Sequence, residues 1–285
     1  MSSRVRVPNV LTIAGVDPSG GAGVLADLKA FSALGAYGCG VIAALTAQNT
    51  RAVTGIHEVP PGFLKLQLDT LFDDVRIDAV KIGMLASRAL IGVVADALRR
   101  YAPPFVVLDP VMVAKSGDRL LRAEAVDALK RELLPLATVL TPNLPEAGDL
   151  LGHAVADSTE AMRDAARALH ALGPKRVLVK GGHGSGDTLV DVLFDGDRVV
   201  ELPAQRIRTR NTHGTGCTLS SAIAALLPQR PTVEAAVRDA RAYVLEAIRR
   251  ADELQVGSGH GPLHHFHHLW AGANARQARL REVTE

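Results

Sequence analysis

Residues 10–23 read VLTIAGVDPSGGAG, and this stretch decides the fold. Val10–Ala14 is a short, β-rich apolar run of the kind that forms a buried strand. Gly23–Leu34 follows with helical spacing, and the glycines between the two segments let the backbone approach a small ligand closely. The stretch predicts a strand, a turn and a helix, the repeating unit of open α/β sheets. The alternative is a purely structural turn, and the spacings of the two common nucleotide motifs, G-x-G-x-x-G and G-x-x-x-x-G-K-[ST], are absent.

The same alternation of strand and helix continues along the chain. Nearly continuous apolar runs predict buried parallel strands at Gly40–Leu45, Ala79–Ile82, Phe105–Leu108, Thr138–Leu140 and Arg176–Val179. Helical spacing predicts helices at Pro61–Phe72, Arg88–Arg100, Arg122–Leu133, Thr159–Leu172 and Val233–Ala251, with Ser158 and Thr232 as N-caps. Thr188–Phe194 and Val199–Leu202 flank Asp195-Gly196-Asp197, a hairpin turn signal. We therefore expect an α/β fold: a mostly parallel central sheet with helices on both faces and an antiparallel hairpin at one edge.

The composition fits a globular enzyme and argues against several other classes. Hydrophobic residues make up 47% of the chain and charged residues 22%, which is too apolar for a disordered protein. A net charge of +2 without a basic run argues against nucleic-acid binding. Two distant cysteines, Cys39 and Cys217, cannot form a disulfide framework. With no apolar signal core and no run approaching the roughly 20 apolar residues of a membrane span, we expect a cytoplasmic protein without membrane contact.

Residues 211–221 read NTHGTGCTLSS and carry the strongest chemical signal. Glycines before a helix place backbone N–H groups at its positive end, where a phosphate or a developing oxyanion binds well. A thiol at that position has its thiolate favoured, so Cys217 would accept a proton from a substrate hydroxyl. That chemistry is typical of a kinase. The alternative is a cysteine packed as a small hydrophobe at the start of a buried helix.

Polar residues follow two other strands. Gln48, behind an apolar run, offers a donor pair and an acceptor to a heteroaromatic amine, although Asn49 and Thr50 also fit an ordinary strand-ending turn. Asp109, at the end of another strand, can hold Mg²⁺ directly or through water; as an aspartate before a proline it also fits a turn.

The next two strand ends complete this set of polar groups. Asn143 and Glu146 lie three residues apart at a helix start, where Glu146 can orient Mg²⁺ waters and Asn143 can bond phosphate oxygens. The alternative is an Asn cap with glutamate at the third helical position. Lys180, beside a glycine-rich segment, is a cation suited to nucleotide phosphates or simply a solvated lysine.

Taken together, these motifs resemble the bacterial family of kinases that phosphorylate 4-amino-5-hydroxymethyl-2-methylpyrimidine and its monophosphate, within the ribokinase-like superfamily. The resemblance covers about residues 9–268 in the right order. It is carried by residues 14–23, 26–29, 47–50, 109–117, 141–147, 179–183 and 213–218.

The resemblance implies a role for each matching position. The pyrimidine would be bound by Gly15, Asp17, Ala22, Asp27, Gln48, Met84 and Val111. Some relatives have glutamate at position 48; a neutral Gln48 amide would make affinity depend little on pH. Cys217 would be the general base, and the backbone N–H groups of Gly214, Thr215, Gly216 and Cys217 would form the anion hole.

The nucleotide side follows in the same way. ATP and Mg²⁺ are the implied cofactors, with Asn143, Lys180, Arg208, Thr209 and Thr212 at the nucleotide and Asp109 and Glu146 at the metal. A second transfer, onto the phosphate ester, is implied by the resemblance alone. Residues 115–119 and 181–186 are candidate lids over the site.

The C-terminal part holds five of the ten histidines in residues 257–268. We interpret this run as a structural tail, since it contains no cysteine or acidic ligand and the family commonly ends with Gly-Pro and a His pair. Residues 1–268 are expected to form one kinase domain and residues 269–285 a surface helix or a disordered extension. Superfamily relatives are often dimers, which implies a homodimer. Two other functions fit the same residues: a pyridoxal kinase, or a pyrimidine-binding regulator without turnover.

Overall fold

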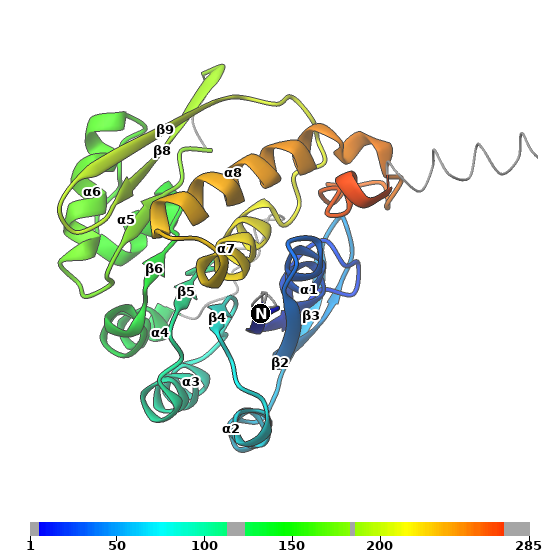
Figure 1. The fold of residues 1–285 in the computed structure, drawn as a ribbon, viewed down its shortest axis with the longest axis vertical. Helices are drawn as coiled ribbons and strands as arrows, with labels where there is room; N and C mark the ends of the chain where they lie inside the picture. The colour runs from blue at the N-terminus through cyan, green and yellow to red at the C-terminus, as the bar shows by residue number, and fades with distance from the viewer. Residues whose placement is uncertain (1–5, 113–122, 183–185, 271–285) are drawn as a thin grey trace, which may run out of the picture.

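The structure is a computed structural model that describes residues 6–112, 123–182 and 186–270. Its described strands form one nine-stranded sheet in the order β3-β2-β1-β4-β5-β6-β7-β8-β9 (Figure 1). The strands are β1 Asn9–Val16, β2 Tyr37–Gln48, β3 Val53–Glu58, β4 Ala79–Ile82, β5 Val106–Leu108, β6 Val139–Leu140, β7 Val177–Val179, β8 Thr188–Phe194 and β9 Val199–Gln205.

The centre of the sheet is parallel, from β2 through β1, β4, β5 and β6 to β7. The β8–β9 hairpin adds antiparallel strands after β7, which confirms the predicted fold class and edge hairpin. The opposite edge differs from the prediction, because β3 pairs antiparallel with β2 there. This strand was missed because its sequence VTGIHE is short, partly exposed and interrupted by a glycine, so it lacks a clear apolar run.

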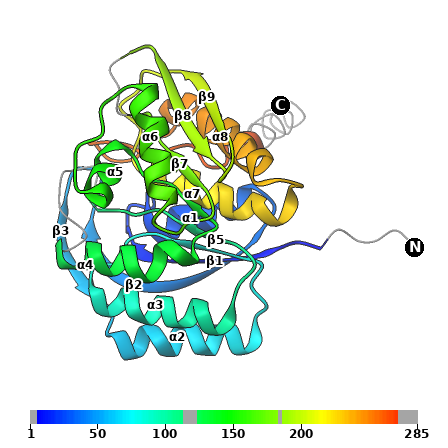
Figure 2. The same cartoon turned by 90° about the vertical axis from the view of Figure 1, so that its left-hand side faces the viewer.

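Helices cover both faces of the sheet, as expected. They are α1 Gly23–Ala33, α2 Pro61–Asp74, α3 Arg88–Tyr101, α4 Ala123–Ala128, α5 Leu144–Leu151, α6 Thr159–His170, α7 Thr215–Leu226 and α8 Val233–Arg249. Successive strand residues face opposite sides: Leu11 and Ile13 pack in the core cluster with α2 to α6, and Val10 packs in the cluster with α1, α7 and α8. Figure 2 shows α2 and α3 lying side by side on the first of these faces.

Local signals set most helix ends. The side chains of Ser158 and Thr232 cap α6 and α8 by accepting from backbone N–H groups at 3.2 Å and 3.1 Å, as predicted. The helix predicted up to Leu133 instead changes after α4 into a wider π-type turn, Leu129–Leu133, and then a 3₁₀ turn that contains Pro135. A proline supplies no N–H to the helical ladder, so a regular α-helix does not continue through this segment. Across the described ranges, no helix is both long and apolar enough to cross a membrane.

Candidate active site

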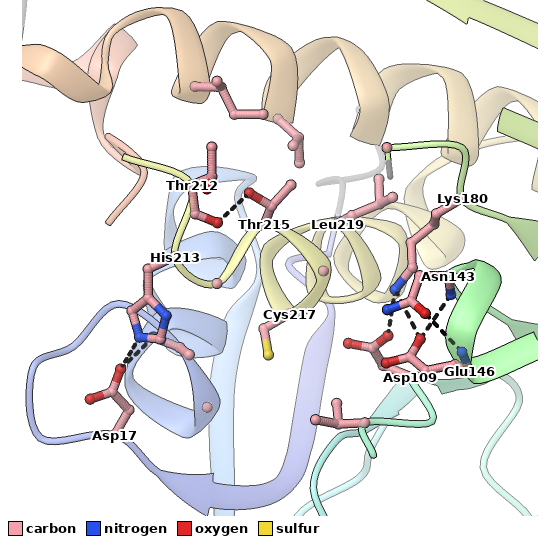
Figure 3. A pocket seen from close by; sticks show the side chains of 18 of the residues that line it. Asp17, Asp109, Asn143, Glu146, Lys180, Thr212, His213, Thr215, Cys217 and Leu219 are labelled. Atoms are coloured by element: carbon pink, nitrogen blue, oxygen red, sulfur yellow. Dashed lines mark hydrogen bonds and ion pairs between the residues drawn. The ribbon is translucent and has the colours of Figure 1, made fainter. Parts of the chain in front are cut away.

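A cavity of about 860 Å³ lies at the carboxyl ends of the parallel strands. Residues just beyond five of these ends line it: Asp17 after β1, Met84 after β4, Asp109 after β5, Asn143 after β6 and Lys180 after β7. The N-terminus of α7 lies between the Asp17 side and the Asp109 side (Figure 3). Parallel strands deliver their carboxyl ends to one edge, so residues far apart in the sequence meet there. The volume is that of a small-molecule site.

The structure brings together all but one of the predicted site residues. Those that line the cavity are Gly15, Asp17, Ala22, Gln48, Met84, Asp109, Val111, Asn143, Glu146, Lys180, Arg208, Thr209, Thr212, Gly214, Thr215, Gly216 and Cys217. The exception is Asp27, which is fully buried and is not among the lining residues. From its position on α1, the Asp27 carboxylate points toward the sheet. It contacts other buried side chains and not the cavity in which a substrate would lie, contrary to the prediction.

Asp27 belongs to a buried charge cluster that the sequence analysis missed. Lys81 on β4 lies 2.8 Å and 3.0 Å from the two Asp27 carboxylate oxygens, and hydroxyls of Thr12 and Ser221 donate to them at 2.6 Å and 2.7 Å. Thr12 and Lys81 are paired in register, so both face α1 and α7. The available signal was a lysine inside an apolar strand, since a buried lysine needs a buried partner.

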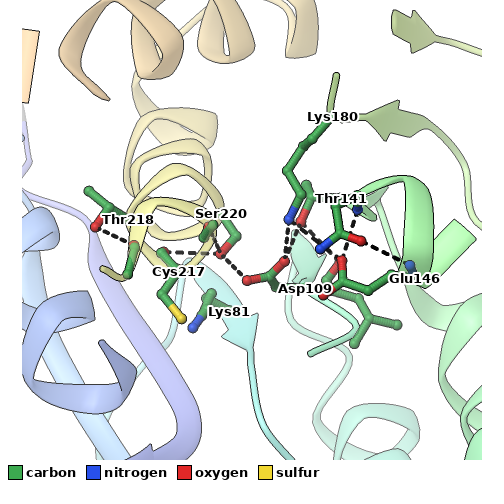
Figure 4. Close-up of polar contacts among 12 residues, drawn as sticks. Lys81, Asp109, Thr141, Glu146, Lys180, Cys217, Thr218 and Ser220 are labelled. Atoms are coloured by element: carbon green, nitrogen blue, oxygen red, sulfur yellow. Dashed lines mark hydrogen bonds and ion pairs between the residues drawn. The ribbon is translucent and has the colours of Figure 1, made fainter. Parts of the chain in front are cut away.

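The Lys81 amine is held as a cation. Burial lowers the pKa of Lys81, but the negative charge of Asp27, together with Cys217 and Asp109, raises this pKa by more than burial lowers it. The net pKa therefore lies above the ordinary value. Lys81 also lines the cavity, and Figure 4 shows its amine beside the Cys217 thiol. A fixed positive charge therefore lies next to the predicted base.

The backbone before α7 forms the predicted anion-binding turn. Gly214 has a φ of 78°, and a Cβ there would lie 1.8 Å from the Gly21 carbonyl oxygen, so only glycine fits. Among the described residues, no side chain caps this helix N-terminus. The Thr215 N–H already donates to the Thr212 carbonyl at 3.3 Å, which leaves Gly214, Gly216 and Cys217 as the better placed donors.

The Cys217 side chain points into the cavity between Asp17 and Asp109 (Figure 3). Its protonation differs from the prediction, because burial raises the pKa of the thiol to about 11. Lys81 and a backbone hydrogen bond from Gly23 lower this pKa, but they do not outweigh burial together with the nearby Asp27 and Asp109 charges. The expectation of a favoured thiolate is wrong for this structure.

Asp109, Glu146 and Lys180 form a second charge cluster on the other side of Cys217 (Figure 4). The Lys180 amine lies 3.0 Å from Asp109 Oδ1 and 3.7 Å from Glu146 Oε2. Burial raises the pKa of Glu146 to about 7, with Lys180 lowering it and Asp109 raising it. Thr141 and Ser220 donate to Asp109 at 3.2 Å and 3.3 Å.

Asn143 and Glu146 also form a capping box at the start of α5. Asn143 Oδ1 accepts from the Glu146 N–H at 2.9 Å, and Glu146 Oε2 accepts from the Asn143 N–H at 2.8 Å. The capping alternative is therefore present in the structure. Because both side chains also line the cavity, the cap fixes their positions there.

His213 is a further cavity residue whose partner the sequence did not reveal. Its Nε2 lies 2.7 Å from Asp17 Oδ2, and Asp17 also accepts from the Ser19 and Ala22 N–H groups at 2.9 Å and 3.0 Å. Burial raises the pKa of Asp17, but the hydrogen bonds from His213 and Ser19 lower it, and the net pKa is below its usual value. This bond joins the turn after β1 to the turn before α7 across 196 residues.

The rim carries the remaining predicted residues. The polar residues near Gln48 belong to the end of β2 rather than to a loop, and the Thr46 hydroxyl donates to Gln48 Oε1 at 3.2 Å. Arg208 pairs with Asp187 at 2.7 Å, and the Thr209 hydroxyl donates to Asp252 at 2.6 Å. The candidate lid of residues 115–119, and residues 183–185 of the other, lie outside the described residues.

Two solved structures that share this architecture are kinases. The chain is 34% identical to pyridoxal kinase from Staphylococcus aureus in complex with ADP, with a TM-score of 0.84 over 92% of this chain and 94% of that one. It is 41% identical to phosphomethylpyrimidine kinase from Clostridium difficile, with a TM-score of 0.76 over 85% of this chain and 99% of that one. The chain thus shares the fold of these kinases.

Sequence comparison narrows this class to one family. The phosphomethylpyrimidine kinase family model matches residues 17–264. The chain is also 54% identical to the hydroxymethylpyrimidine/phosphomethylpyrimidine kinase of Rhizobium meliloti, over 91% of this chain and 97% of that protein. The corresponding Escherichia coli kinase is 52% identical over 92% and 98%. The chain belongs to the phosphomethylpyrimidine kinase family.

Proposed function

We propose that this protein transfers the ATP γ-phosphoryl group to the hydroxymethyl oxygen of 4-amino-5-hydroxymethyl-2-methylpyrimidine, and then phosphorylates the resulting monophosphate, in thiamine biosynthesis. The observation that carries the proposal is the cavity in which Cys217 and the α7 N-terminus face Asp109, Glu146 and Lys180. In phosphoryl transfer the protein mainly positions the reactants and stabilises charge with hydrogen-bond donors and cations, and these residues supply both. Relatives named for both pyrimidine substrates support the substrate assignment.

Two ends of the cavity suit the two substrates. Gly15, Gln48, Met84 and Val111 would hold the pyrimidine; Met84 and Val111 pack in one small apolar cluster that a heteroaromatic ring can contact. The Gln48 amide would bond the ring nitrogen and exocyclic amine. Asn143, Lys180, Arg208, Thr209 and Thr212 would hold the nucleotide, and the Gly214, Gly216 and Cys217 N–H groups would bind the transferring phosphoryl oxygens.

Asp109 and Glu146 are proposed to hold Mg²⁺. Both are buried carboxylates, and oxygen donors from one or two carboxylates with phosphate and water are the ligands that Mg²⁺ prefers. Within residues 6–112, 123–182 and 186–270, no group of three or more His, Cys, Asp or Glu side chains could hold a metal, so phosphate oxygens would complete the shell. Bound Mg²⁺ would neutralise phosphate charge.

Cys217 is proposed to take the proton of the substrate hydroxyl. With a thiol pKa of about 11, forming the thiolate at pH 7 costs about 5 kcal/mol, but the thiolate is then a stronger base. We expect Cys217→Ala to lower kcat by roughly 10² to 10⁴ with substrate binding little changed. Turnover within a few-fold of the unmodified enzyme would remove Cys217 from this role.

A coupled ADP-release assay with hydroxymethylpyrimidine, its monophosphate and pyridoxal tests the activity. We expect turnover with both pyrimidines to exceed turnover with pyridoxal. Turnover with pyridoxal alone would make the protein a pyridoxal kinase. Pyrimidine binding without turnover of any compound would make it a regulator.

We further propose a homodimer that works in the cytoplasm as one domain of residues 1–268. The β3 edge is open, and Leu45 and Ile56 near it are 50% and 42% exposed, which favours pairing with a second copy. The free thiols Cys39 and Cys217 suit a reducing compartment. Sedimentation of the purified protein tests the dimer, and a single species at the monomer mass would exclude it.

A further inference from the structure

The glycine strap, defined as residues 257–262 with the sequence GSGHGP, lies against two turns that border the cavity. One is the turn after β2, two residues beyond Gln48, and it meets the strap through Thr50. The other is the turn before α7, which meets the strap through Asn211 and His213. The strap thus touches both the proposed pyrimidine side and the proposed nucleotide side.

Backbone hydrogen bonds hold the strap on both turns. On the pyrimidine side, Gly259 N donates to Thr50 Oγ1 at 3.1 Å and His260 N donates to the Thr50 carbonyl at 2.9 Å. On the nucleotide side, Gly261 N donates to Asn211 Oδ1 at 3.1 Å, and His213 N donates to the Gly261 carbonyl at 3.0 Å. The strap therefore bonds the turn after β2 through Gly259 and His260, and the turn before α7 through Gly261.

Close packing accounts for the three glycines. A Cβ on Gly257 would lie 2.2 Å from Thr50 Oγ1, and one on Gly259 would lie 2.1 Å from the Thr50 carbonyl oxygen. A Cβ on Gly261 would lie 2.3 Å from Asn211 Oδ1. A passive tail has no need of a glycine at every second position. Gly259 is required because it meets the backbone of Thr50, whereas Gly257, with a positive φ, and Gly261 lie against the side chains of Thr50 and Asn211.

We propose that the glycine strap couples the two binding sites. When the pyrimidine orders the turn after β2, the turn before α7 would favour the arrangement that binds the nucleotide, and nucleotide binding would order the turn after β2 in the same way. His213 continues the path, since its backbone bonds the strap and its ring bonds Asp17 on the pyrimidine side. Coupling between sites is a free energy shared by both ligands, so each must tighten the other by the same factor. The inference rests on the proposed function, which assigns one ligand to each side.

Calorimetry measures this factor directly. The affinity for β,γ-methylene-ATP with Mg²⁺ is determined with and without saturating hydroxymethylpyrimidine, and the ratio is the coupling factor. We expect a factor of at least about 5 in the unmodified protein and a factor near 1 in Gly259→Ala, whose added methyl separates the strap from Thr50. Thr50→Val, which removes the hydroxyl acceptor of one hydrogen bond, should lower the factor by at least about twofold toward 1.

Two controls separate coupling from folding. Ser258→Ala changes an exposed side chain in the same strap and should keep the full coupling factor. Thermal unfolding of each variant shows whether it is folded, and Thr50→Val replaces Gly259→Ala if the latter is not. An unchanged factor in the folded strap variants, or a factor of 1 in the unmodified protein, overturns the proposal while leaving the kinase intact. Failure of the unmodified protein to bind either ligand removes the proposed function, and the strap coupling with it.

Discussion

The titration of Cys217 tests how burial and local charge combine at the proposed base. With a pKa of about 11, roughly one thiol in 3,000 is ionised at pH 7.5. An unhindered thiol with a pKa near 8.5 is about 10% ionised at that pH. A thiolate of higher pKa is also the stronger nucleophile, so alkylation of Cys217 by iodoacetamide should be roughly 15- to 30-fold slower than that of an exposed cysteine. The rate should become about tenfold faster with each pH unit up to pH 9.5.

The measurement uses a Cys39→Ala background, so that Cys217 is the only thiol in the chain. Alkylation is followed by mass spectrometry over pH 6.5 to 9.5. The same protein in urea serves as the reference and should show a rate that levels off above pH 8.5. A plateau near pH 7 in the folded protein would refute the reasoning, because it would mean that Lys81 and the α7 N-terminus outweigh burial.

Three other predictions follow from buried polar groups. Lys81→Met leaves Asp27 buried without its cation and should lower the free energy of unfolding by about 3–5 kcal/mol in urea titrations. Adding Asp27→Asn to the Lys81→Met chain should restore part of this free energy. Equal stability of all variants would contradict the ion pair. Burial lowers the pKa of His265 to about 3, so below pH 6.5 the unfolded chain binds a proton that the folded chain does not. His265 should therefore lower the free energy of unfolding by up to about 1.4 kcal/mol for each pH unit below 6.5. A His265→Gln variant with the same acid sensitivity would exclude this. Gln48→Ala should raise KM for the pyrimidine by about tenfold and leave KM for ATP unchanged, and a rise in the ATP value alone would place Gln48 on the other substrate.

Local sequence signals were enough to predict eight of the nine described strands, most helices and many of the cavity residues. Val10–Ala14 and Phe105–Leu108 are apolar runs whose type does not depend on distant contacts, and each leads into a turn that holds an aspartate, Asp17 or Asp109. The parallel arrangement then brings those turns together without further information. The missed strand β3 has no such run, because one sheet edge is partly exposed to solvent and needs few apolar residues.

The errors concern properties that depend on distant partners. Asp27 pairs with Lys81 across 54 residues, and only this pairing shows that Asp27 faces the core and not the substrate. The pKa of Cys217 depends on how deeply α7 is packed and on Asp27 and Asp109, which local helix-end reasoning does not include. His213 meets Asp17 only after the first and last thirds of the chain have come together.

Under the proposed function, the two charge clusters beside Cys217 would favour the binding of an added cation. Asp27, Asp109 and Glu146 supply three carboxylates, and Lys81 and Lys180 supply two amines, each already close to a carboxylate. Neither amine is left over for a polyanionic nucleotide, and burial together with the nearby Asp109 charge raises the pKa of Glu146 despite the Lys180 amine. A divalent cation at Asp109 and Glu146 would free Lys180 to contact phosphate, while Lys81, which lines the cavity and pairs with the buried Asp27, would remain beside the sulfur. The two lysines would then serve different atoms of one reaction, Lys180 the phosphate oxygens and Lys81 the thiolate that receives the proton.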